Sequence, residues 1–176
     1  MIEVERKYLV KNNSYKMQAQ RAGLIVQGYL GDNPLSETRI AIRDNHGWLF
    51  IKAKGTLSRF EWQQEIPLYE AQELLKFCPN VIRKVRYIVY HMGNKWEIDE
   101  FLGENEGLVI AECELSQATL NPPLPDFVGE EVTEDTKYYN YNLASNPYMN
   151  WDDDSERFRE YNGCSDEKST TVSSNH

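Results

Sequence analysis

The sequence predicts an α+β fold in which antiparallel strands dominate. Charged and apolar residues alternate along a series of short stretches, as in Trp96-Glu97-Ile98-Asp99. This period of two is typical of strands, because successive side chains point to opposite faces of a sheet. Turn-forming groups such as Asp44-Asn45-His46-Gly47 and Gly93-Asn94 stand between neighbouring stretches, at the spacing of hairpins.

The alternating stretches give eight expected strands, and the segments between and after them give four expected helices. The strands cover residues 1–10, 25–30, 37–43, 48–54, 59–66, 84–89, 96–99 and 111–115. The helices are expected at 14–22, 69–77, 134–144 and 152–161. The first of these helices has possible caps in Asn12-Asn13-Ser14 and a stop at Gly23, and the second follows Pro67. Residues after Gly163 have the polar composition of a disordered tail.

The length, net charge and cysteine content of the chain argue against some classes of protein. With 176 residues the chain is long enough for one domain with a sizeable core. A net charge of −9 disfavours general binding to nucleic acids or anionic membranes, although a local basic site can still take a small anion. Cys78, Cys113 and Cys164 are widely spaced and suggest neither a disulfide framework nor a zinc site. We therefore expect a soluble, cytoplasmic protein.

One face of the expected strands collects many charged side chains of both signs. The acids are Glu3, Glu5, Glu61, Glu65, Glu97, Asp99, Glu112 and Glu114, and the bases are Lys7, Arg39, Arg43, Lys52, Arg59, Lys84 and Arg86. A polar face on an antiparallel sheet is usually solvated. If helices instead cover the apolar face, a closed sheet would enclose the charges, and a polyphosphate with divalent cations would balance them. The alternation alone leaves both readings open.

Particular motifs resemble one known family. Glu3-Val4-Glu5-Arg6-Lys7 has the ExExK pattern of the CYTH superfamily, also called triphosphate tunnel metalloenzymes. Further stretches resemble the later strands and the end of its short bacterial members, in the same order: Gln27–Leu30, Ile51-Lys52, Leu57–Glu61, Arg83–Tyr87, Trp96–Phe101, Ala111–Leu115 and Gly129–Asp135. The resemblance covers residues 1–148 as one domain and leaves 149–176 as an acidic tail.

The resemblance implies a fold and a set of residue roles. The family fold is an eight-stranded antiparallel tunnel with a charged lumen. The implied ligands of Mg²⁺ or Mn²⁺ are Glu3, Glu5, Glu112 and Glu114, with Glu61, Glu97 and Asp99 as further acidic lining. The implied contacts to the triphosphate are Lys7, Arg39, Lys52, Arg59, Lys84 and Arg86. Lys84 and Tyr29 match the positions of a catalytic pair in the tripolyphosphatase-like members, and a nearby cation would favour a tyrosinate at Tyr29.

Two positions depart from the family pattern. Ala41 stands where relatives usually carry a second arginine, and Arg43, on the same face, is a candidate replacement as a substrate contact. Gln63 stands where many relatives have a carboxylate, which would weaken a second metal site.

The resemblance predicts a metal-dependent hydrolase that cleaves inorganic tripolyphosphate to pyrophosphate and phosphate. Three alternatives stay open at this point: a class IV adenylate cyclase, a thiamine-triphosphatase-like enzyme, and a polyphosphate-binding module without catalysis. The expected partner is a small anionic triphosphate, neither nucleic acid nor a membrane, and a homodimer is compatible with the sequence.

Overall fold

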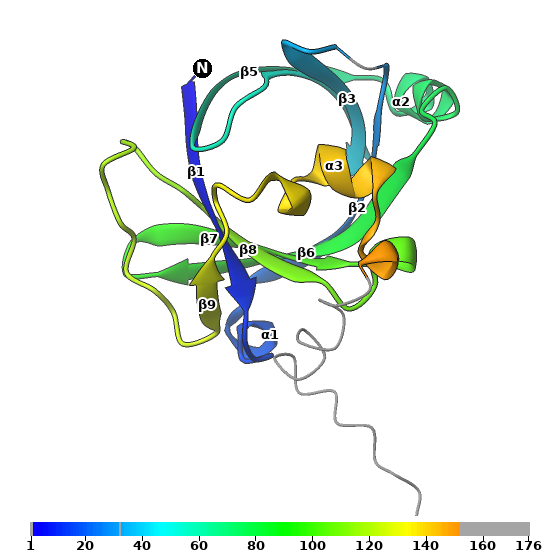
Figure 1. Cartoon of the computed structure of the whole chain (residues 1–176). Coiled ribbons are helices and arrows are strands. Elements are labelled where there is room, and N and C mark those ends of the chain that lie inside the picture. Colours follow the sequence, from blue (N-terminus) through cyan, green and yellow to red (C-terminus); the bar gives the residue numbers. More distant parts are fainter. Residues whose placement is uncertain (1, 32, 152–176) are drawn as a thin grey trace, which may run out of the picture.

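Eight antiparallel strands close into a barrel in the computed structural model, which describes residues 2–31 and 33–151 (Figure 1). The strands are β1 (Ile2–Val10), β2 (Arg21–Tyr29), β3 (Ser36–Arg43), β4 (His46–Ala53), β5 (Ser58–Ile66), β6 (Val81–His91), β7 (Asn94–Phe101) and β8 (Val109–Glu114). Their order around the barrel is β5-β4-β3-β2-β6-β7-β8-β1, and β1 pairs with β5 again. The expected eight-stranded closed sheet is therefore confirmed.

The first strand closes the barrel because its two halves have different partners. Ile2–Val4 pairs with β5, whereas Glu5–Leu9 pairs with β8. A ninth strand, β9 (Val128–Glu131), lies against the end of β1 through Tyr8 and Val10 and was not among the expected strands. The hairpin turns are found where they were expected, with positive φ at Asp44 and Asn45 between β3 and β4.

Two expected helices have different bounds for identifiable reasons. The helix α1 (Tyr15–Gln18) is only four residues long, because the chain from Arg21 pairs with β6 as part of β2 instead of continuing the helix. The expected helix 134–144 is divided into η2 (Thr136–Tyr138) and α3 (Asn140–Ser145), because Tyr139 between them is extended. The remaining helix, α2 (Leu68–Leu75), lies close to the expected position.

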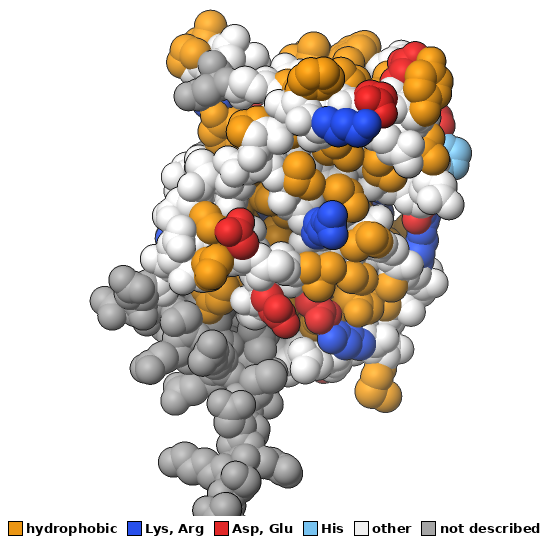
Figure 2. Space-filling model, turned by 90° about the vertical axis from the view of Figure 1, so that its right-hand side faces the viewer, with side chains coloured by type: hydrophobic (Ala, Val, Ile, Leu, Met, Phe, Trp, Pro, Cys, Tyr) orange, Lys and Arg blue, Asp and Glu red, His pale blue; other side chains and the backbone are white. Residues whose placement is uncertain are grey.

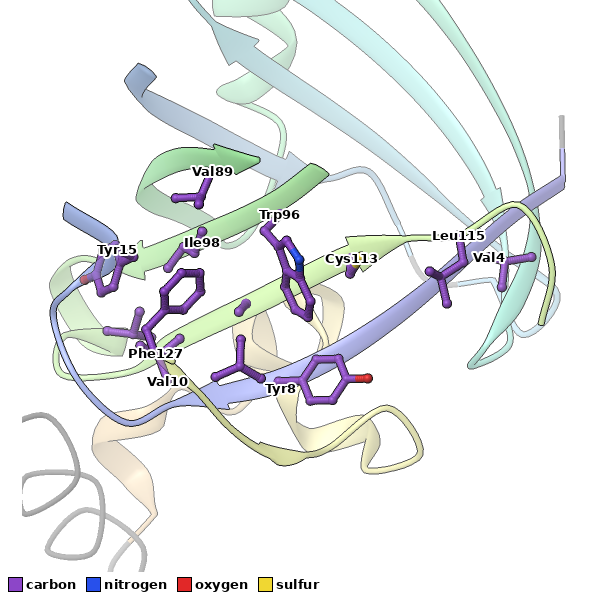
Figure 3. Packing of buried hydrophobic residues seen from close by; sticks show 13 residues of the cluster. Val4, Tyr8, Val10, Tyr15, Val89, Trp96, Ile98, Cys113, Leu115 and Phe127 are labelled. Carbon is purple, nitrogen blue, oxygen red and sulfur yellow. The ribbon is translucent and has the colours of Figure 1, made fainter. Parts of the chain in front are cut away.

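The main hydrophobic core lies outside the barrel (Figure 3). Side chains that alternate with the charged ones, such as Tyr8, Trp96 and Ile98, pack together on the outer surface of β1, β7 and β8. Tyr15 from α1 and Phe127 from the segment before β9 cover them. Apolar residues thus face outward and are covered, which leaves the charged face for the lumen. Other hydrophobic side chains gather on the side of the molecule that carries α2 (Figure 2).

A second apolar cluster fills one end of the lumen. Leu9, Ile82, Phe101 and Ile110 continue the inward rows of their strands, and they pack against the C-terminal segment that crosses the barrel opening (Figure 1). That segment contributes Val132, Tyr138, Leu143, Tyr148 and Trp151. The short η1 (Gly103–Asn105) and η3 (Tyr148–Asn150) lie beside this end. The barrel is consequently filled by side chains at one end.

Packed residues extend to Trp151, whose ring contacts Tyr138 with 5.3 Å between centroids. The helix expected at 152–161 and the tail after it lie outside the described residues. Within the part of the chain that is described, no helix is long and apolar enough to span a membrane.

Phe127→Ala is expected to lower the free energy of unfolding by about 3–5 kcal/mol, because its fully buried ring packs between Tyr15 and Trp96. Phe77→Ala makes the same change at a residue that is 75% exposed, and it should cost no more than about 0.5 kcal/mol. Urea unfolding followed by tryptophan fluorescence measures both. Equal losses would contradict a core on the outer surface of the barrel.

Candidate active site

The charged face of the strands encloses a cavity of about 500 Å³ in the lumen. Most of the residues predicted from the sequence line it: Glu3, Glu5, Lys7, Tyr29, Arg39, Arg43, Lys52, Arg59, Glu61, Arg86, Glu97, Glu112 and Glu114. Lys84 and Asp99 belong to the same inward rows but lie in the wall behind Arg86, with 1% and 0% of their side chains exposed. The inward reading of the alternation is therefore correct. Glu65 lies elsewhere, in an exposed pair with His46.

The strands β1 and β8 bring a lysine between two carboxylates. Lys7 Nζ donates to Glu5 Oε1 at 2.5 Å and also to Glu112 Oε1. Burial raises the pKa of Glu112, but Lys7, Arg86 and Lys84 together outweigh burial and hold this pKa well below its ordinary value. Glu112 is therefore a carboxylate throughout the physiological pH range.

A second group of charges joins β1 to β4 and β5. Lys52 Nζ contacts Glu3 Oε2 and lies 3.2 Å from Glu61 Oε2. Arg59 reaches Glu5 Oε1 at 3.5 Å. Burial and the neighbouring Glu5 raise the pKa of Glu3 above its ordinary value, despite Lys52. The carboxylates of Glu3 and Glu5 thus repel each other, and a bound cation would reduce this repulsion.

The third group lies on β6 and β7. Arg86 binds both oxygens of Asp99 at 2.6 Å, and it also reaches Glu97 and, at 3.0 Å, Glu112 Oε2. Lys84 Nζ donates to Asp99 Oδ2 at 2.5 Å. Burial lowers the pKa of Lys84, and Asp99 offsets this only in part. Asp99 therefore fixes the two inward-facing basic side chains of β6, Lys84 and Arg86.

The cations of β3 are held by aromatic rings instead of carboxylates. The Arg39 guanidinium lies 4.2 Å from the centre of the Phe50 ring, and that of Arg43 lies 4.4 Å from the Trp48 ring. Among the described residues neither arginine forms an ion pair. Ala41, between them, faces the same way and is buried opposite Trp48. Arg43 lies two residues beyond Ala41 along β3. There it also lines a second cavity of about 570 Å³, which adjoins the first.

Tyr29 lines the cavity, and its hydroxyl accepts a hydrogen bond from Gln27 Nε2 at 3.1 Å. Burial raises the pKa of Tyr29, Glu37 raises it further, and Arg39 only partly opposes them. The phenol is therefore the favoured form: Arg39 and Lys7 favour the tyrosinate, but burial and Glu37 outweigh them. Lys84 lies in the wall opposite Ile25 of β2, with its ammonium directed to Asp99.

Several lining residues were not predicted. They are Glu37, Phe50, Trp62, Lys95, Tyr139, Asn140 and Tyr141. Glu37 could have been found, because it precedes Arg39 by two residues on the same strand. The residues at 139–141 had no such signal, since they reach the lumen only because the C-terminal segment folds back across the barrel.

The donor set suits a divalent cation. Glu3 and Glu5 on β1 and Glu112 and Glu114 on β8 all face the cavity, and carboxylate oxygens are the ligands that Mg²⁺ and Mn²⁺ prefer. Glu5 and Glu114 are direct partners across the two strands. No three acidic, histidine or cysteine side chains of residues 2–31 and 33–151 form a ready metal cluster. Lysines and arginines occupy the oxygens of Glu3, Glu5 and Glu112, so the carboxylates would have to exchange partners.

Two proteins of similar sequence are both named inorganic triphosphatase. No family model matches the sequence. An inorganic triphosphatase of Acetivibrio thermocellus is 43% identical over 152 residues, which are 85% of this chain and 97% of that protein. An inorganic triphosphatase of Nitrosomonas europaea is 32% identical over 152 residues, 82% of this chain and 97% of that one.

The fold is also similar to that of an inorganic triphosphatase. A crystal structure of an inorganic triphosphatase superimposes with a TM-score of 0.60 at 28% identity, over 81% of this chain and 93% of that chain. The closed barrel with its charged lumen agrees with this match. The chain therefore belongs to the triphosphate tunnel (CYTH) family, in the branch of the inorganic triphosphatases.

Proposed function

We propose that this protein hydrolyses inorganic tripolyphosphate to pyrophosphate and phosphate, with a divalent metal ion as cofactor. The observation that carries the proposal is the lumen, where fixed lysines and arginines from β1, β3, β4, β5 and β6 surround one cavity. A linear triphosphate carries several negative charges, which such a set of cations can bind at several points. The relatives named inorganic triphosphatase support the same substrate.

The ion pairs of the lumen suggest how the substrate enters. Lys7, Lys52 and Arg86 each bind carboxylates that also line the cavity. Phosphate oxygens would compete for these cations, and the carboxylates thus released would be free to hold the metal. Arg39 and Arg43, which are positioned by aromatic rings, can receive phosphate without giving up a carboxylate. Binding of anion and cation would thus favour each other.

The residues proposed to hold the metal are Glu3, Glu5, Glu112 and Glu114, with Glu61, Glu97 and Asp99 as further acidic groups. Mg²⁺ or Mn²⁺ would supply charge neutralisation at the phosphoryl oxygens. The chain itself binds and orients the phosphates through Lys7, Arg39, Arg43, Lys52, Arg59 and Arg86. Lys84 and Tyr29 are the proposed catalytic pair, in which the Tyr29 phenol is protonated and can donate a hydrogen bond to an oxygen or orient water.

A substrate panel tests the proposal. Tripolyphosphate, ATP and thiamine triphosphate are each incubated with the protein and Mg²⁺ or Mn²⁺, and phosphate and pyrophosphate are measured. We expect fastest release from tripolyphosphate and no release when EDTA replaces the metal. Cyclic AMP from ATP would identify a cyclase instead, and tight tripolyphosphate binding by calorimetry without turnover would identify a binding module.

The remaining expectations follow from this function. The partner is a small anionic triphosphate and not a nucleic acid, in agreement with the net charge of −9. We also propose a cytoplasmic location, and size measurement in solution will decide between a monomer and a homodimer.

A further inference from the structure

The C-terminal segment places three consecutive side chains in the cavity: Tyr139, Asn140 and Tyr141. Each of them contacts a basic or catalytic residue of a different strand. The Tyr139 ring lies 5.1 Å from Lys7 Nζ and 5.2 Å from the Arg59 guanidinium. These contacts show that the segment is part of the cavity wall and does more than fill the end of the barrel.

Asn140 has the most specific contact of the three. Its Oδ1 accepts a hydrogen bond from Lys84 Nζ at 3.2 Å, beside the 2.5 Å bond from the same ammonium to Asp99. The next residue, Tyr141, packs edge-on against Tyr29 with 5.2 Å between ring centroids. One turn of α3 therefore touches both members of the proposed catalytic pair.

The geometry points to Asn140 as a positioning residue that directs the Lys84 ammonium toward the substrate. This inference rests on the proposed role of Lys84. Lys84 is fully buried, and Asp99 alone would hold its ammonium in the wall between β6 and β7. Asn140 lines the cavity whereas Asp99 does not. The Asn140 oxygen therefore holds the Lys84 ammonium from the cavity side, and Asp99 holds it from the wall. A side chain held from two directions is fixed in place, and small displacements of a catalytic group cost rate.

Two substitutions of Asn140 separate positioning from structural support. Asn140→Leu has nearly the same shape but no acceptor, and kcat for tripolyphosphate should fall by about 10–100-fold while KM changes by less than about threefold. Asn140→Asp keeps the acceptor, so kcat should largely recover. Its added negative charge repels the substrate, so KM should rise. A purely structural role would give the same loss in both variants.

Asn142→Leu is the matched control. Asn142 is on the same short helix, its Nδ2 donates to Thr136 O at 2.7 Å, and it does not line the cavity. This variant should keep the wild-type kcat. Thermal unfolding of all three variants shows whether α3 remains packed.

The possible failures are distinct. If the wild-type protein does not release phosphate from tripolyphosphate, the proposed function is wrong. If the wild-type protein is active and Asn140→Leu keeps its kcat, or if Asn142→Leu loses as much, the positioning role of Asn140 is overturned.

Discussion

Lys84→Met is expected to lower kcat for tripolyphosphate by about 10²–10³-fold, the usual cost of removing one fixed group that stabilises transition-state charge. Methionine is also unbranched and is only one atom shorter than lysine, but it has no charge to offer a phosphoryl oxygen. The fold should survive, because Asp99 keeps both of its 2.6 Å bonds to Arg86 and is not left as an unpaired buried carboxylate.

Lys76→Met is the control for this change. Lys76 follows α2, and among the described residues its ammonium pairs only with the exposed Glu73, so phosphate release should stay within roughly twofold of the wild type. Steady-state phosphate release gives kcat and KM for both variants, and circular dichroism checks their folding. A folded Lys84→Met protein with the wild-type kcat would remove Lys84 from the catalytic pair.

The inner face of the barrel was predictable because a strand has a strict period of two. If Glu3 faces the lumen, Glu5 and Lys7 must face it too, because every second side chain of a strand points to the same face. The same rule predicts the inward-facing residues of each later strand. This rule could not tell which inward residues reach the cavity. Lys84 and Asp99 are covered because the apolar cluster and α3 fill their end of the lumen, and that depends on the path of a distant segment.

Local pattern failed where tertiary contacts were stronger. A continuous helix at 134–144 would conflict with the position of Tyr139, whose hydroxyl donates to Thr133 O at 2.5 Å and whose ring lies beside Lys7 and Arg59. The helix expected at 14–22 likewise stops early because Gln20 N donates to Ile88 O at the start of the pairing with β6. In both cases long-range hydrogen bonds outweigh helix propensities of a few tenths of a kcal/mol per residue.

Glu112→Gln is expected to lower the free energy of unfolding at neutral pH by about 3 kcal/mol, the low end for a buried ion pair that loses one partner. Lys7 and Arg86 would both lose a carboxylate, although the amide oxygen can still accept one hydrogen bond. Glu114→Gln is the matched control, two residues along the same strand. Glu114 is exposed and has no ion pair among the described residues, so its substitution should cost no more than about 0.5 kcal/mol.

The effect of Glu112 should also depend on pH in one direction. Its pKa is lower in the folded protein than its ordinary value of 4.5, so the folded state binds fewer protons than the unfolded state. The stabilisation is complete above pH 4.5 and is lost as the pH falls through the folded-state pKa. Urea unfolding of both proteins from about pH 7 down to about pH 3 should therefore show the difference between wild type and Glu112→Gln shrinking in acid. A difference that stayed constant over this range would mean that Glu112 stabilises the barrel through packing and not through its charge.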